Sequence, residues 1–260
     1  MKNLVKFFSL VFFLAFTVSC GDDDSDSPST NLENAEFEFN MAEPPITVPS
    51  ALAQSTDANA QQINTWLATA NEMTNLLSNF EIQPGATKSN TPVGKQGAVN
   101  GRTKEDVVVY TYTQSDDQGN SISVAYQISE EENNYIFEVF WQYNEGGFQR
   151  LIYAEESKDP LRNGFMEVYL TDPTSPVSSS EFILRYEWEE TAAGFTFRVF
   201  DSGDAFELMI VVLPDNSGSL TLSYSGVRSY EATWNADGTS GTFSTFDSEG
   251  NEESSGTWSV

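Results

Sequence analysis

The stretch from Ser121 to Tyr153, SISVAYQISEEENNYIFEVFWQYNEGGFQRLIY, decides the fold. Its apolar side chains recur at every second position, in one row of Ile122, Val124, Tyr126 and Ile128 and a second row of Tyr135, Phe137, Val139, Trp141 and Tyr143. A period of two is that of a β-strand, whose successive side chains point to opposite faces. Gly146-Gly147 follows the second row as a turn signal. We therefore expect neighbouring strands joined by tight turns.

The same alternation continues over residues 106–260 and predicts about eleven or twelve short strands. Turn signals separate the rows at Ala193-Gly194, Asp215–Gly218, Asp237-Gly238 and Glu249-Gly250. Strands this close in sequence pair antiparallel, because parallel pairing needs a long crossover. The predicted fold class is mainly β: a long antiparallel meander that forms either a barrel or a strongly curved open sheet.

One helix is expected before the sheet, over about residues 57–80. Apolar residues recur there at three- and four-residue spacing, at Ile63, Trp66, Leu67, Ala70, Met73, Leu76, Leu77 and Phe80. Ser55 or Asp57 can cap its start, and Pro84 with Gly85 stops it. Such a helix must lie on something, so it covers the apolar face of the sheet or plugs a barrel. Residues 86–104 are expected to be a loop.

The beginning of the chain has the pattern of an export signal. Lys2 and Lys6 precede an apolar run over residues 7–18, which is shorter than the roughly 20 residues needed to span a bilayer. Residues 1–19 therefore read as a signal peptide, and residues 20–35 as a small, polar and acidic tether too poor in apolar residues to pack. Residues 36–260 are expected to form a single domain.

Charge and composition exclude several classes of function. The chain carries a formal net charge of −27, which disfavours nucleic-acid backbones. It has no histidine, and Cys20 is its only cysteine, so zinc sites and Ser-His or Cys-His catalysis lack their side chains. We expect no metal and no cofactor, and we favour a protein without enzymatic activity.

A carboxylate pair is the one catalytic arrangement left. Arg185, Glu187 and Glu189 share one face of a predicted strand, and two carboxylates two residues apart could flank a glycosidic bond. The alternative is a solvated face with an ion pair to Arg198 on the next strand, which we favour. Glu130–Glu132 and Glu155-Glu156 are expected at solvated turns.

Aromatic residues make up 13% of the chain, a high share for so polar a sequence. The bulkiest rings on the predicted strands include Trp141, Tyr143, Tyr186 and Trp188. They are expected mainly to fill the core, and the functional alternative is a pocket that holds a small apolar or sugar ligand.

Two short motifs near the beginning resemble those of bacterial lipoproteins. Thr17-Val18-Ser19-Cys20 resembles a lipobox, with Thr17 where leucine is more usual. The resemblance implies that Cys20 carries the lipid, palmitate included, after cleavage by signal peptidase II. Asp22, Asp23, Asp24 and Asp26 resemble the acidic export signal of Bacteroidota lipoproteins, which implies an outer-membrane protein facing the cell exterior.

One hairpin near the other end resembles a known repeat. Residues 230–241, YEATWNADGTSG, are similar to one MORN-type hairpin, with Ala232 where that pattern has glycine. The whole chain resembles Bacteroidota surface lipoproteins of unassigned function. We expect a membrane-anchored, non-enzymatic module that binds a ligand or an unidentified protein partner. The alternatives are a carboxylate-dependent glycan hydrolase and a purely structural surface protein.

Overall fold

A computed structural model gives the fold of residues 32, 35, 46–75, 82–93, 107–161, 163–171, 182–203 and 205–260. It contains two helices, α2 (Ser50–Gln54) and α3 (Ala58–Asn75). Thirteen strands follow: β1 (Thr87–Ser89), β2 (Val107–Ser115), β3 (Ser121–Glu131), β4 (Asn134–Tyr143), β5 (Gln149–Ser157), β6 (Asn163–Tyr169), β7 (Phe182–Thr191), β8 (Gly194–Asp201), β9 (Glu207–Val212), β10 (Gly218–Tyr224), β11 (Val227–Trp234), β12 (Ser240–Phe246) and β13 (Glu252–Ser259).

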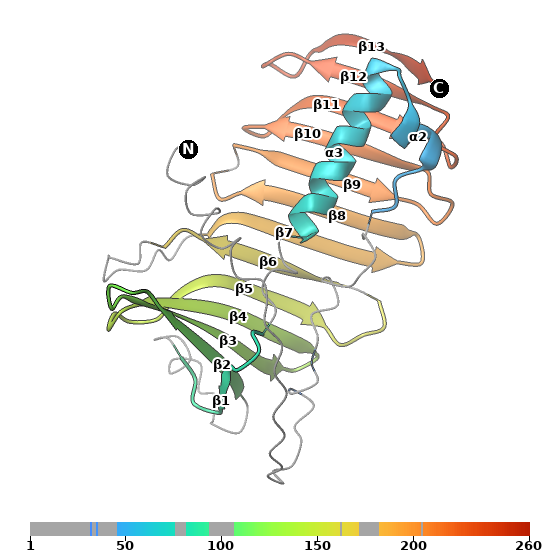
Figure 1. Ribbon diagram of the computed structural model, residues 1–260. Coiled ribbons are helices and arrows are strands. Elements are labelled where there is room, and N and C mark those ends of the chain that lie inside the picture. The colour runs from blue at the N-terminus through green and yellow to red at the C-terminus, as the bar shows by residue number, and fades with distance from the viewer. Residues whose placement is uncertain are drawn as a thin grey trace.

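The strands form one antiparallel sheet whose spatial order equals their order in the chain. The sheet has two free edges, β1 and β13, so of the two expected architectures it adopts the open one (Figure 1). Its strands rotate strongly from β1 to β13, as the right-handed twist of strands requires. The predicted meander on which a helix packs is thus confirmed.

Helix α3 crosses the sheet over β7 to β13 and buries one stripe of side chains (Figure 1). Ile63, Leu67 and Ala70 are 0% exposed and belong to the main core cluster. Asp57 caps the helix as expected, because its Oδ1 accepts hydrogen bonds from the backbone N–H groups of Asn59 (2.9 Å) and Ala60 (3.2 Å). The expected continuation over residues 76–80 lies outside the described residues.

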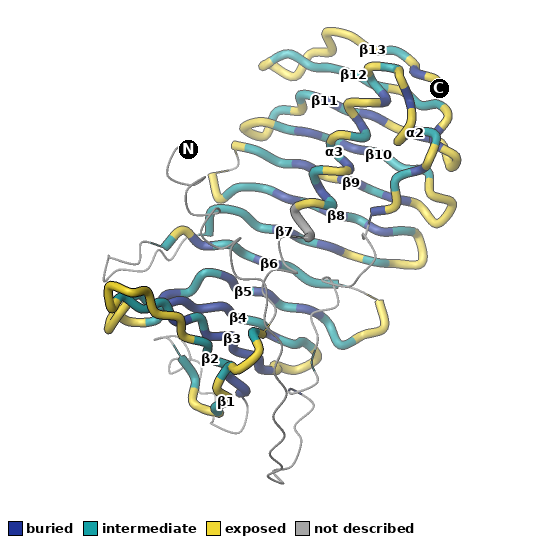
Figure 2. The backbone as a smooth tube through the Cα atoms, viewed as in Figure 1, coloured by how far each residue is buried: buried dark blue, intermediate teal, exposed yellow. Residues whose placement is uncertain are grey.

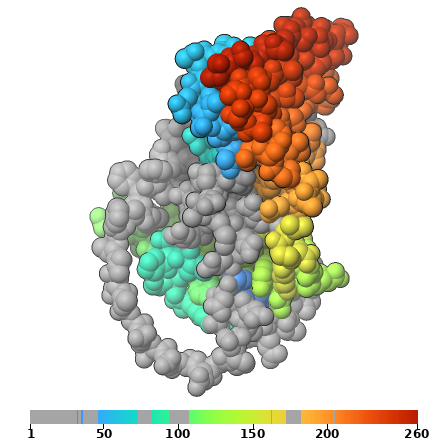
Figure 3. Space-filling model, turned by 90° about the vertical axis from the view of Figure 1, so that its right-hand side faces the viewer, coloured from blue at the N-terminus to red at the C-terminus, as the bar shows by residue number. Residues whose placement is uncertain are grey.

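Both helices lie on the same face of the sheet. Seen from the side, the helices lie against one face of the orange and red strands (Figure 3). Within the described ranges, neither helix has the length and apolar character needed to cross a membrane.

Three expectations for short segments were wrong. The expected loop over residues 86–104 contains β1, whose three residues pair with the edge of β2. Helix α2 was not expected, because five residues after a proline give no helical period. Glu156 was expected at a solvated turn, but β5 continues to Ser157 and turns Glu156 inward, where it is 2% exposed.

Glycines under tryptophans shape the core on the helix-covered face. Trp188 lies across from Gly164, and a Cβ atom built on Gly164 would come within 2.6 Å of the indole Cζ2. The same relationship recurs where Trp234 faces Gly218 and Trp258 faces Gly241, with indole atoms at 2.7 Å from the added Cβ. The indoles therefore lie flat on the sheet, and α3 can approach it.

Helix α3 does not extend over strands β2–β4, which bury apolar side chains in two separate hydrophobic clusters. Val107, Val109, Ala125 and Phe140 pack on one face of β2–β4, and Val108 and Ile128 pack with Leu32 on the other. Buried residues therefore follow the middle of the strands across the sheet, and the hairpin turns stay exposed (Figure 2).

Candidate functional site

The face of the sheet opposite α3 carries a row of alternating acids and arginines, here called the charged row. It consists of Glu138 on β4, Arg150 on β5, Glu167 on β6, Arg185 and Glu187 on β7, Arg198 on β8 and Glu207 on β9. Tyr186 and Trp188, which alternate with Arg185 and Glu187, point to the core, so the charged row faces away from the helix.

Five ion pairs join the members of the charged row. Arg150 Nη2 lies 2.5 Å from Glu138 Oε1 at one end. In the middle, Arg185 contacts Glu167 through Nη1 (2.6 Å) and Glu187 through Nε (2.8 Å). Arg198 contacts Glu187 through Nη1 (3.2 Å) and Glu207 through Nε (2.7 Å), and this second contact raises the pKa of the Arg198 guanidinium.

Each arginine of the charged row also lies over an aromatic ring. The guanidinium carbon is 3.8 Å from the ring centroid of Phe165 for Arg185, 4.2 Å from Phe200 for Arg198 and 4.9 Å from Tyr153 for Arg150. A cation over a ring face is attracted by the ring quadrupole. Ion pairs and rings therefore hold the three arginines in fixed positions.

Tyr169 bridges the one gap in the row. Its ring lies 5.8 Å from the guanidinium carbon of Arg150, and its hydroxyl donates a hydrogen bond to Glu167 Oε2 (2.5 Å). Burial and the Glu167 carboxylate raise the pKa of Tyr169 to about 12, so the hydroxyl keeps its proton at neutral pH.

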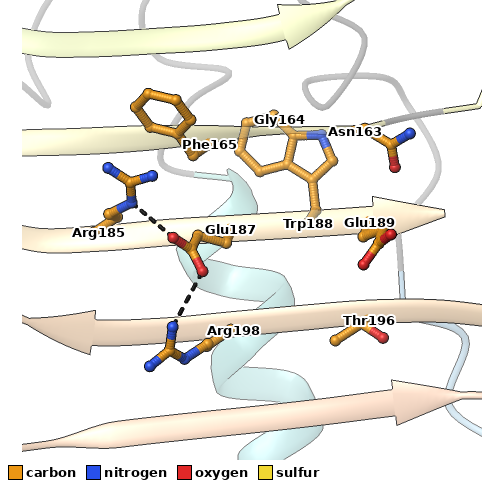
Figure 4. A pocket seen from close by; sticks show the side chains of 9 residues that line it. All are labelled: Asn163, Gly164, Phe165, Arg185, Glu187, Trp188, Glu189, Thr196 and Arg198. Carbon is orange, nitrogen blue, oxygen red and sulfur yellow. Dashed lines mark hydrogen bonds and ion pairs between the residues drawn. The ribbon is translucent and has the colours of Figure 1, made fainter. Parts of the chain in front are cut away.

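A pocket lies in the middle of the charged row (Figure 4). Its volume is about 470 Å³, within the range of roughly 300–1,000 Å³ typical of small-molecule sites, and it is open rather than enclosed. Strands β6, β7 and β8 supply the lining: Asn163, Gly164, Phe165, Arg185, Glu187, Trp188, Glu189, Thr196 and Arg198.

One wall of the pocket holds polar groups that are not used by the charged row. Asn163 pairs in register with Glu189, and Glu189 pairs with Thr196. The Oδ1 of Asn163 accepts a hydrogen bond from the backbone N–H of Glu190 (2.9 Å), and the Nδ2 of Asn163 donates to no described residue. Among the described residues, the Glu189 carboxylate and the Thr196 hydroxyl have no hydrogen-bond partner.

The expected ion pair between Glu187 and Arg198 is confirmed. Both carboxylate oxygens of Glu187 accept hydrogen bonds, Oε1 from Arg185 and Oε2 from Arg198. Neither oxygen is free to protonate a leaving group or attack a substrate atom. Glu187 and Glu189 lie together in the pocket, but in different environments.

The four aromatic residues selected from the sequence do not form one site. Tyr186 and Trp188 are 3% and 2% exposed and lie in the core, where Tyr186 packs against Phe197. Trp141 is buried at one end of β4 and donates a hydrogen bond to Thr171, and Tyr143 is half-buried at the same end. Of the four, Trp188 alone contributes to the pocket lining.

The remaining sequence-predicted positions lie outside the described residues: Cys20, Asp22, Asp23, Asp24 and Asp26. In the part of the chain that the structure describes, no three acidic or cysteine side chains gather as a metal-binding group would require.

Asn163, Phe165 and Thr196 were not identified from the sequence. Each is an ordinary strand residue, and each joins the pocket only because the strand register sets it beside Glu187 or Glu189. Comparison with known proteins adds no candidate, since no family model and no curated protein matches the chain.

Proposed function

We propose that this protein is a lipid-anchored surface protein that binds a ligand without chemically changing it, at the pocket on the charged row. The observation that carries the proposal is the arrangement of the pocket wall. Asn163, Glu189 and Thr196 present unfilled hydrogen-bonding groups beside arginines that are already fixed in place. Preorganised polar groups around a concave surface are what ligand recognition requires.

The location rests on the sequence. An apolar run followed by Thr17-Val18-Ser19-Cys20 supports lipidation at Cys20, and the aspartates at positions 22–24 and 26 support export to the outer face of the outer membrane. The acidic tether between the lipid and the domain would leave the pocket free to meet ligands outside the cell.

Binding is favoured over hydrolysis by the state of Glu187. A glycosidase needs one carboxyl group that gives up a proton and a second that acts as base or nucleophile. Arg185 and Arg198 occupy both oxygens of Glu187. Glu189 alone cannot carry out both roles.

A ligand screen by thermal stability tests the proposal. The full chain is mixed with a library of saccharides, peptides and small metabolites, and a ligand that binds the folded state raises the melting temperature. We expect at least one class to do so, and Thr196→Trp, which fills the pocket, to abolish the shift. Thr221 on β10 lies on the same face of the sheet as the charged row but outside the pocket lining, so Thr221→Trp should leave the shift in melting temperature unchanged.

The outcomes separate the three candidate functions. If no compound raises the melting temperature, or if the increases persist in Thr196→Trp, a binding function at this pocket is contradicted. The purely structural role then remains. Turnover of chromogenic glycosides that is lost in both Glu187→Gln and Glu189→Gln would establish the hydrolase instead.

A further inference from the structure

The pocket wall allows the ligand class to be inferred, on the basis of the proposed binding function. We infer that the pocket takes a neutral saccharide, whose hydroxyl groups contact Asn163, Glu189 and Thr196. The inference rests on the charge of the lining, the type of free polar groups and the length of the row that they form.

The charges in the lining cancel. Arg185 and Arg198 contribute two positive charges, and Glu187 and Glu189 contribute two negative ones. The protein as a whole carries −27, so its field opposes the approach of anions. Among the described lining residues, a cationic ligand would find a single unpaired carboxylate, that of Glu189, beside two arginines that already pair with other glutamates. A neutral ligand is opposed neither by the field of the whole protein nor by these two arginines.

The free groups are mixed donors and acceptors. Asn163 Nδ2 donates, the Glu189 carboxylate accepts, and the Thr196 hydroxyl does both. A sugar hydroxyl also donates and accepts, so adjacent hydroxyls can satisfy all three groups at once. A purely apolar ligand would bury these groups without partners, which disfavours it.

The row is long enough for linked rings. Asn163, Glu189 and Thr196 lie on three adjacent strands, so the row spans two inter-strand spacings, or about 10 Å. The open pocket lets an extended chain enter along this row. Phe165, on the same face as Glu187, adds apolar surface to the lining against which the C–H face of a sugar ring can pack (Figure 4).

The inference is tested by titrating the full chain with defined oligosaccharides. The protein is kept in a detergent without a sugar headgroup, because a glycosidic detergent would compete for the pocket. The probes are cello-, xylo-, manno- and maltohexaose, with an oligogalacturonate of equal length as the acidic probe and an oligolysine peptide as the cationic one. Affinity is measured by calorimetry. At least one neutral hexasaccharide should bind, without turnover, more tightly than either charged probe.

Three variants then locate the contacts. Thr196→Val keeps the side-chain shape and should weaken binding by about 3- to 10-fold, and Glu189→Gln, which removes a charged acceptor, by at least about tenfold. Asn163→Asp keeps the oxygen that accepts the hydrogen bond from the Glu190 backbone but removes the Nδ2 donor, and should also weaken binding. Thr221→Val is the matched control and should bind as the unmodified chain does.

Each contrary result has a definite meaning. Pocket-dependent binding of the oligogalacturonate or the oligolysine alone would overturn the saccharide inference and leave the proposed binding function standing. Neutral saccharides that bind equally well to Thr196→Val, Glu189→Gln and Asn163→Asp would place the saccharide site elsewhere. Saccharides that do not bind at all would also refute the inference, while the wider ligand screen still decides the binding function.

Discussion

The indole of Trp188 lies against Gly164 on the neighbouring strand so closely that the sheet has no room there for a methyl group. The pair joins the two faces of the protein. On the face covered by α3, the indole belongs to the core against which the helix packs. On the opposite face, the backbone at Gly164 contributes to the pocket lining. Core packing and the candidate site therefore depend on the same position.

Gly164→Ala should destabilise the domain. The added Cβ would meet Trp188 Cζ2 at 2.6 Å and would also clash with the backbone oxygen of Glu155. Overpacking of this kind costs about 1–3 kcal/mol in the free energy of unfolding. Gly147→Ala is the control, because its added Cβ meets nothing within 4 Å. Equal urea midpoints for the two variants would contradict the close packing.

Leu67→Asp should unfold the domain or weaken it by several kcal/mol. Leu67 is 0% exposed between α3 and the sheet, and an unpaired charge there has no compensating partner. Ala68→Asp places the same charge on the exposed side of the same helix turn and should have a small effect. Thermal melting of both variants distinguishes a docked helix from a free one, for which the two effects would be alike.

Glu138→Gln should be far more costly than Glu130→Gln. Glu138 is 3% exposed and bonded by Arg150 and Gln127, so its loss leaves a guanidinium without its anion, at about 3–5 kcal/mol. Glu130 is 47% exposed in its pair with Lys158, and such pairs contribute about 0–1 kcal/mol. The two free energies of unfolding are compared in urea. Similar losses would mean that the charged row is held mainly by its aromatic rings.

Alkaline pH should destabilise the protein through Tyr186. Burial raises the pKa of this hydroxyl from 10.0 to about 12, so the folded state favours the protonated form. The resulting stability is fully present below pH 10 and is lost as the pH rises towards 12, by about 2–3 kcal/mol at most. The pKa values of Tyr169 and Tyr230 are also raised to about 12, so Tyr186→Phe should reduce the loss of stability in that window without abolishing it. Tyr224→Phe removes the same hydroxyl from an exposed ring and should not.

Cys20→Ser should abolish incorporation of labelled palmitate and leave the chain unprocessed or soluble. Removal of residues 22–26 should keep the lipid but lose exposure on the cell surface, because it deletes the proposed acidic export signal. Mass spectrometry, membrane fractionation and protease treatment of intact cells measure these effects. Unchanged membrane fractionation of Cys20→Ser would refute the lipid anchor, and equal protease accessibility after the deletion would refute the export signal.

The fold could be predicted where local pattern determines structure. Side-chain alternation located β2 to β13, and the three- to four-residue period with the Asp57 cap located α3. Strand β1 and helix α2 could not be found from local pattern, because β1 depends on pairing with β2 and α2 depends on the burial of Leu52 in a core built by distant segments. The sequence also could not show whether the sheet closes into a barrel or stays open. The curvature of the sheet depends on register shifts between strands, such as those at Val139/Phe140 and Leu222/Ser223.

The candidate site was predictable only in part. Alternation along a single strand placed Arg185, Glu187 and Glu189 on one face, and the next strand offered Arg198. The pocket itself needs three strands in known register, and no local feature of Asn163 or Thr196 marks them as partners of Glu189. The contact of Tyr169 with Arg150 depends on the pairing of β6 with β5, which no local pattern in either strand reveals.

The strand order has a consequence for how the protein is made. Each strand pairs with its neighbour in the sequence, so hairpins can form one after another as the chain emerges. Helix α3 is synthesised before the sheet, but much of the apolar surface that buries Ile63 and Leu67 belongs to strands that follow residue 182. During synthesis the apolar stripe of Ile63 and Leu67 therefore stays uncovered until these later strands have been made. A chain that ends before β11 lacks Tyr230, Ala232 and Trp234, so it would leave part of the apolar surface of α3 exposed to water.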